Sequence, residues 1–295
     1  MYPNHSIEDL RVLASKLTAS LNTEPEKFRA IFKWVCDNIR NDYELYQANK
    51  KKRERLSGDE LRKWNKDFNA VVFEKLRKSH ATVCTGYAYL IREMSHDAGL
   101  SCEIVNGYGR NVVSNIGGNG ILNHSWNAVK LDDTWYLCDA TWASGSIDTQ
   151  RKSFVRKYSD VYFLADPDQF INNHYPQDLQ WSLIDHAPSL SEFLNAPLAY
   201  AAAIREHVNA NDPMFDVTVR KGDRLKLSLD GPSGLSKRLA MVVGESRVSG
   251  QSAAQTESGN RVHYQLSQVF YFKGTYAVHI LLNDEYLYSY RVLVK

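Results

Sequence analysis

The sequence has few cysteines, little net charge and no long apolar run, and each absence argues against one class of protein. Its four cysteines show neither the spacing of a disulfide framework nor a Cys-x-x-Cys pair, and it has no His-Glu-x-x-His motif, so no metal site is expected. The formal net charge of +2 offers no basic excess for binding nucleic acid. No stretch approaches the roughly 20 apolar residues that a membrane span requires.

Glycine is also scarce where a nucleotide site would need it. The densest group is Gly117-Gly118-Asn119-Gly120, but it does not follow a strand and open a helix as a phosphate-binding loop does. We therefore expect no nucleotide and no other cofactor. Residues 111–123 are expected to form a hairpin loop at the edge of a cleft, either as a substrate lid or as a simple connection.

The sequence leaves the compartment and the oligomeric state open. No N-terminal apolar signal region is present. A signal peptide that had been removed would leave no trace in this sequence. The expected location is therefore secreted or periplasmic if such a signal was removed, and cytoplasmic otherwise.

The composition that is present suits a folded chain of about two domains. With 43% hydrophobic and 24% charged residues, the 295 residues can bury a substantial core. Every Trp and every Cys precedes the linker-like segment Asn209–Pro213, so we expect one domain over 1–212 and a second over 213–295. Amphipathic helices are expected after Ser6–Asp9 and after Thr23–Glu26, and a linker helix is expected over 199–204.

The second expected domain consists of short strand-like runs separated by turn residues, which is typical of an all-β sandwich. Gly274–Val278 resembles the tyrosine corner of immunoglobulin-like domains, with Val278 where a disulfide cysteine would stand. We therefore expect an immunoglobulin-like sandwich without a disulfide and without a catalytic site of its own. The runs are 215–220, 224–229, 239–243, 262–267, 275–282 and 286–294.

Cys84 precedes a stretch with the periodicity of a helix. Apolar residues between 87 and 98 recur at the spacing of one helical face, and Gly99 is placed to end the helix. Cys84 should therefore lie at a helix N-terminus, where unpaired backbone N–H groups favour a thiolate and can stabilise an oxyanion. The alternative is that Cys84 is a small buried apolar residue, as free cysteines usually are.

His124 and Asp139 fall at the two ends of a predicted hairpin. Residues 124–131 alternate as a strand does, Asp132-Asp133 is a turn signal, and residues 134–138 form the returning strand. A carboxylate that holds an imidazole fixes its tautomer and stabilises the imidazolium, as the base for a thiol nucleophile requires. Taken singly, His124 would be a structural histidine and Asp139 a turn residue, so the prediction depends on all three residues together.

Three stretches of this chain resemble the transglutaminase-like superfamily. They are Val83–Ala88, His124–Asn127 and Trp135–Trp142. Ile31–Ile39 is similar to the helix that precedes the core in many bacterial members, and segments between 162 and 184 look like the kyphoscoliosis-peptidase-like branch. The resemblance extends over roughly residues 25–197.

The resemblance implies a papain-like fold of the α+β class, with helices packed on an antiparallel sheet, followed here by the immunoglobulin-like sandwich. It implies a catalytic triad of Cys84, His124 and Asp139 that needs no metal. The expected function is that of a cysteine peptidase or amidase that cleaves a protein or peptide substrate through a thioester on Cys84. Two alternatives remain open: an acyltransferase that crosslinks proteins, and a catalytically silent scaffold whose cleft binds a partner.

Two features depart from the family pattern. Many relatives have an aromatic residue where this chain has Asn41, which leaves the second oxyanion donor unassigned. A basic helical segment over Lys50–Lys66 lengthens the span before Cys84, and it is either part of the cleft entrance or a solvated face. His80 lies close to Cys84 in sequence but has no neighbouring carboxylate to orient it, so we expect it at the surface or rim.

Overall fold

The computed structural model describes residues 2–3, 5–112, 114–117, 120–148, 151–212, 214–244, 246–247, 254–258 and 261–295. These residues form two compact units. The first comprises 1–107, 122–167 and 176–183, and the second comprises 108–121, 168–175 and 184–295. Pro213, where the second domain was predicted to begin, lies outside the described residues, and the boundary at 212/213 stays a prediction.

The first unit contains both predicted N-terminal helices. Asp9 caps the first by accepting from the Val12 N–H, and Thr23 forms the predicted capping box with Glu26 on the second. The helices of this unit are α1 (Leu10–Thr18), α2 (Glu24–Asn38), α3 (Tyr43–Arg53), α4 (Gly58–Ser79), α5 (Cys84–Asp97) and α6 (Ala140–Ser144), with 3-10 turns η1 (Asp160–Tyr162) and η2 (Leu179–Ser182). None of the helices in the described part of the chain is both long and apolar enough to cross a membrane.

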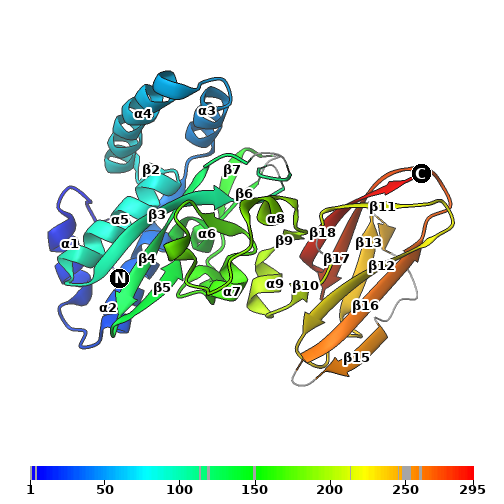
Figure 1. Ribbon diagram of the computed structural model, residues 1–295. Coiled ribbons are helices and arrows are strands. Elements are labelled where there is room, and N and C mark those ends of the chain that lie inside the picture. Colours follow the sequence, from blue (N-terminus) through cyan, green and yellow to red (C-terminus); the bar gives the residue numbers. More distant parts are fainter. Residues whose placement is uncertain are drawn as a thin grey trace. The chain divides into compact units, whose positions relative to one another are not determined.

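The sheet of the first unit is antiparallel and carries α5 against it (Figure 1). Its strands are β3 (Ser101–Gly109), β4 (His124–Leu131) and β5 (Thr134–Cys138), in the order β5-β4-β3. The buried side chain of Asn127 donates to the Ala88 carbonyl at 3.0 Å, which ties α5 to the central strand. Apolar faces of α2 and α5 complete the core on this side of the sheet.

Two small strand pairs complete the first unit. In the parallel pair, β1 (Arg40–Asn41) lies beside β2 (Ala81–Thr82), directly before the predicted nucleophile. The antiparallel pair consists of β6 (Gly145–Asp148) and β7 (Ser153–Arg156). Helix α7 (Pro167–Phe170) and strand β8 (His174–Pro176) lie where the chain passes from the first unit to the second and back.

The basic segment over Lys50–Lys66 is not one helix as predicted. The chain leaves α3 at Glu54 and starts α4 at Gly58, whose φ of +53° suits a turn that most residues would disfavour. Ser57 with Glu60 three residues later is a helix-start signal at this turn, and the prediction overlooked it. The two helices therefore form a hairpin between β1 and β2.

The second unit contains an immunoglobulin-like sandwich. One sheet has the order β10-β12-β16-β15, and the other has the order β11-β18-β17-β13-β14, with β9 also on β18. Leu227 and Tyr264 from the first sheet and Ile280 and Tyr290 from the second are buried in one cluster. The strands are β9 (Leu198–Ala199), β10 (Asn209–Ala210), β11 (Asp216–Val219), β12 (Arg224–Gly231), β13 (Leu239–Val243), β14 (Ser246–Arg247), β15 (Ala254–Ser258), β16 (Arg261–Val269), β17 (Gly274–Leu282) and β18 (Glu285–Val294).

All six predicted strand-like runs are confirmed as strands, and the tyrosine corner has its hydrogen bond. The Tyr276 hydroxyl donates to the Phe272 carbonyl, four residues upstream, at 3.0 Å. The predicted linker helix over 199–204 is wrong at its start, because Ala199 belongs to β9. Helix α9 covers Ala201–Arg205, after α8 (Leu190–Asn195).

Candidate active site

Cys84 is the first residue of α5, as the periodicity predicted. Val83 precedes it in an extended conformation and packs into an apolar cluster with α3 and α4. Two residues later, a Cβ on Gly86 would lie 1.9 Å from the Thr82 side-chain oxygen. Glycine at 86 therefore allows the first turn of α5 to lie directly on β2, which fixes where the sulfur begins.

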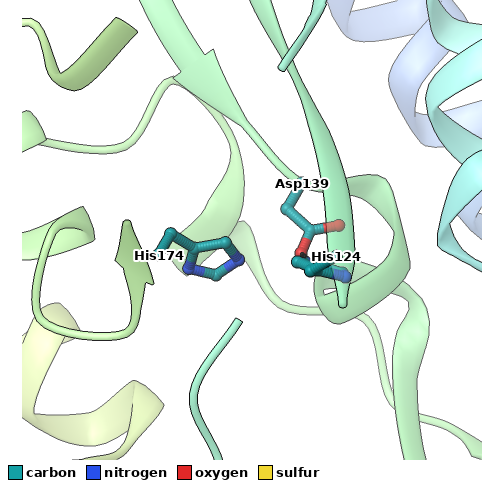
Figure 2. Close-up of side chains that lie close together, drawn as sticks. All are labelled: His124, Asp139 and His174. Carbon is teal, nitrogen blue, oxygen red and sulfur yellow. Dashed lines mark hydrogen bonds and ion pairs between the residues drawn. The ribbon is translucent and has the colours of Figure 1, made fainter. Parts of the chain in front are cut away.

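His124 and Asp139 occupy the predicted ends of the hairpin. His124 is the first residue of β4, and Asp139 directly follows the last residue of β5. The His124 Nε2 donates to the Asp139 Oδ2 at 2.7 Å, and both residues are buried. Figure 2 shows the carboxylate turned toward the imidazole.

Asp139 is held in place by α6 as well as by His124. Its Oδ1 accepts from the backbone N–H groups of Thr141 and Trp142, at 2.7 and 3.2 Å, so Asp139 is the N-cap of that helix. Its own N–H donates to the Tyr162 carbonyl at 2.9 Å. One carboxylate oxygen thus caps the helix while the other orients the imidazole.

The imidazole lies between aromatic rings that the sequence reasoning did not assign to the site. Ring centroids of Trp126 and Trp142 lie 5.9 and 5.3 Å from that of His124. Trp142 in turn meets Tyr162 edge to face at 5.5 Å. Trp126 and Trp142 therefore pack beside the imidazole of His124. Their position two residues after His124 and three after Asp139 was the available signal.

Hydrogen bonding gives the thiol and the imidazole opposite charges. Burial raises the pKa of the Cys84 thiol, but the hydrogen bond with His124, the His124 charge and a hydrogen bond with the Ser125 backbone outweigh it, and the pKa is lowered. Burial likewise lowers the pKa of His124, but Asp139 and Cys84 together raise it to about 10. His124 is therefore an imidazolium near neutral pH, and the lowered pKa of Cys84 shifts its ionisation toward the thiolate.

The other three thiols have the opposite electrostatics. They are fully buried, and burial is the largest cause that raises the pKa of each one. No disulfide links any of the four cysteines. The buried thiols are Cys36 on α2, Cys102 on β3 and Cys138 on β5.

Asn41 lies on β1, which pairs with the strand that leads to Cys84. It pairs with Thr82 in the parallel β1-β2 register, and its buried Oδ1 has no hydrogen-bond partner among the described residues. The second oxyanion donor stays unassigned. His80, at the left-handed C-cap of α4, is partly buried, and its carbonyl accepts from the Arg40 N–H at 2.9 Å.

Two further expectations from the sequence concern a metal site and the loop over residues 111–123. Within the described residues of the first unit, no three His, Cys, Asp or Glu side chains place their ligand atoms close enough together to hold a metal ion. His174, also labelled in Figure 2, belongs to the second unit, where its ring stacks on Phe170 at 4.0 Å. Residues 113, 118 and 119 of the predicted loop, which include Gly118 and Asn119, lie outside the described residues, so the lid stays a prediction.

Part of this chain is similar in sequence to known proteins. Residues 11–140 match the family model described as "Transglutaminase-like superfamily". The chain is 33% identical to the kyphoscoliosis peptidase of Mus musculus over 189 residues, which cover 63% of this chain and 26% of that protein. It is 34% identical to the kyphoscoliosis peptidase of Homo sapiens over 185 residues, covering 62% and 25% of the two chains. It therefore spans about a quarter of the length of these relatives.

Among solved structures, the crystal structure of a TGase aligns with a TM-score of 0.34 and 18% identity, covering 52% of this chain and 32% of that one. The two sequence relatives are from mouse and human, so they give no support to a bacterial branch. The matched span contains Cys84, His124 and Asp139. Residues 11–140 of this chain therefore match the transglutaminase-like superfamily as a domain.

Proposed function

We propose that this chain is a cysteine hydrolase, a peptidase or amidase, in which Cys84, His124 and Asp139 form a catalytic triad. One observation supports this most directly. The Cys84 thiol is hydrogen-bonded to His124, and His124 is hydrogen-bonded to Asp139 at 2.7 Å. A nucleophile, its base and the residue that orients the base are therefore linked by hydrogen bonds. Because Nε2 of His124 is engaged with Asp139, Nδ1 is the nitrogen left to face the sulfur.

The chemistry follows from the charges on these groups. The Cys84 thiolate attacks the carbonyl carbon of an amide, and backbone N–H groups at the start of α5 stabilise the oxyanion. The His124 imidazolium protonates the leaving amine as the C–N bond breaks, which leaves a thioester on Cys84. His124, now neutral, takes a proton from water as that water attacks the thioester, and the carboxylic acid departs with regeneration of the thiolate–imidazolium pair.

The relatives support the proposal only in part. Two of them are named peptidases, and the span of this chain that matches the family model includes the three triad positions. This chain spans about a quarter of each, so their substrates and partners do not transfer directly. A peptide-like amide is the substrate class that the thiol chemistry itself supports.

Hydrolysis is favoured over crosslinking. The thioester on Cys84 is resolved by whichever of water and an amine reaches it first, and crosslinking needs a site that holds an amine while excluding water. Calcium-regulated crosslinkers use acidic ligand loops, and the sequence contains no acidic cluster with calcium-ligand spacing.

The test measures both outcomes in one incubation. Wild-type protein and the C84A variant are mixed with a library of glutamine-containing peptides and a labelled primary amine, and mass spectrometry records cleavage and amine incorporation. We expect cleavage that requires Cys84 and little incorporation. Incorporation without cleavage would replace the hydrolase by an acyltransferase, and neither activity together with an unreactive Cys84 would indicate a binding scaffold.

A further inference from the structure

The hairpin of α3 and α4 is packed directly against the start of the catalytic helix. Leu45 of α3 and Val72 of α4 share an apolar cluster with Val83, the residue before the nucleophile. Phe73 of α4 meets Tyr89 of α5 edge to face, with ring centroids 4.7 Å apart. This inserted hairpin is therefore a neighbour of the Cys84 site and more than a solvated basic face.

Arg53, the last residue of α3, carries a partly buried cation. Its Nε is buried and has no hydrogen-bond partner among the described residues. Burial lowers the pKa of Arg53, and the charge of Cys84 acts in the opposite direction, so the guanidinium lies within electrostatic range of the sulfur. A buried guanidinium N–H without an acceptor costs free energy that a bound anion would recover.

Other cations of the hairpin have different surroundings. Lys75 of α4 forms an ion pair with the buried Asp42. Lys52 lies over the Trp64 ring at 5.5 Å, and Lys51 is exposed to solvent. Arg53 therefore combines a partly buried side chain, an unused donor and an electrostatic interaction with Cys84.

We propose that Arg53 binds a carboxylate of the substrate beside Cys84, so that the site selects peptides with an acidic group next to the scissile amide. This inference rests on the proposed hydrolase function for its biological meaning. A guanidinium matches a carboxylate because its planar, parallel N–H donors engage two oxygens at once. The carboxylate belongs either to an acidic side chain or to a free chain end, and both sources share this chemistry.

The first experiment uses Cys84 as its own reporter and does not require peptidase activity. Iodoacetate and iodoacetamide both alkylate the thiolate with loss of iodide and formation of a thioether, and they differ in that iodoacetate carries a carboxylate. The ratio of their rate constants at Cys84 is measured for the wild type, R53M, R53K and K51M. The neutral reagent corrects each ratio for any change in the reactivity of the thiolate.

We expect the iodoacetate-to-iodoacetamide ratio to fall about tenfold in R53M, the change for a cation a few ångströms from the reagent carboxylate. R53K should retain most of the ratio, and K51M, which removes an exposed cation from the same helix, should leave it unchanged. An unchanged ratio in folded R53M overturns the proposal. An equal loss of rate with both reagents also overturns it, because Arg53 would then act on the thiolate itself.

A second experiment identifies the source of the carboxylate. Three small probes compete with iodoacetamide for the wild-type site: N-acetylglutamate amide, N-acetylglycine and the neutral N-acetylglutamine amide. Protection by the first and not by the third indicates an acidic side chain, and protection by the second indicates a free chain end. Protection by neither carboxylate probe overturns the proposal. The two proposals can fail separately. If the protein cleaves no peptide but shows the Arg53-dependent alkylation ratio, the hydrolase function fails and the carboxylate site stands.

Discussion

Replacing Asp139 by asparagine tests how the site makes its thiolate. The change removes one charge and keeps the carbonyl oxygen that caps α6, because asparagine and aspartate are equally good N-caps. The side-chain nitrogen would now face Nε2 of His124, which would have to accept a hydrogen bond there. The neutral imidazole would then carry its proton on Nδ1, the wrong nitrogen for a base that takes a proton from Cys84.

The size of the effect follows from the contact distance. The His124 Nε2 and Asp139 Oδ2 are 2.7 Å apart, and charge spread over the two groups increases the effective separation. At about 4 Å and an effective dielectric constant of about 20, two unit charges attract by about 4 kcal/mol. Asp139 also raises the pKa of Cys84 directly, and its removal offsets part of this loss. About 2.7 kcal/mol remains, which corresponds to about two pKa units and a hundredfold lower thiolate population.

The assay is the rate of Cys84 alkylation by iodoacetamide as a function of pH. In the wild type the lowered pKa of Cys84 keeps the thiolate populated below the pH at which a free thiol ionises. The rate should therefore persist on the acid side and fall only as pH drops through the lowered pKa. In D139N this acid limb should move about two pH units toward alkali, so that the rate near pH 6 falls about a hundredfold.

A matched control is D42N. Asp42 is also a buried N-cap, accepting from the Leu45 N–H at 2.9 Å on α3, and it pairs with Lys75 rather than with His124. Its substitution should cost stability and leave the pH profile of Cys84 in place. If D139N is folded and its profile coincides with that of the wild type, His124 and Asp139 do not generate the thiolate.

Two further predictions concern the position and the selectivity of the nucleophile. Gly86→Ala should lower the free energy of unfolding by about 3 kcal/mol, since the new Cβ would collide with Thr82, whereas Gly99→Ala should cost about 1 kcal/mol through its positive φ of 82° alone. Urea unfolding of both variants checks this, and equal losses would contradict the close approach of α5 to β2. Limited alkylation near pH 7 should label Cys84 first, because burial raises the pKa of every other thiol. Peptide mapping by mass spectrometry identifies the labelled positions. Labelling of Cys36, Cys102 or Cys138 faster than Cys84 would count against the proposed site.

Much of the candidate site was predictable because its parts are local. The 3.6-residue periodicity after Cys84 predicted the start of α5, and alternation around the Asp132-Asp133 turn predicted β4 and β5. Period-2 patterns likewise predicted six strands of the sandwich. The strands β9, β10 and β14 were missed because two residues hold too little of a repeat, and β15 was missed because it has no apolar residue after Ala254.

Errors arose where a local signal was overlooked or where strand pairing competed with helix propensity. Ser57 with Glu60 three residues later marks the start of α4, but the segment was predicted as one basic helical run. The alanine-rich run at 199–204 has high helix propensity throughout, but pairing of Ala199 with Tyr288 of β18 makes its first residue a strand. In this second place a tertiary neighbour decided the outcome.

By itself the sequence determined which residues begin and end the elements that carry Cys84, His124 and Asp139, since those positions follow from periodicity and turn chemistry within a few residues. Only the tertiary structure decided that α5 packs on β4 through Asn127 and Ala88, and so brings together groups 40 residues apart in Cys84 and His124. It also decided their charges, because the pKa of a thiol depends on burial and on neighbours distant in the chain. Only the tertiary structure shows that the Arg53 side chain is partly buried, because no sequence periodicity distinguishes it from the exposed lysines beside it.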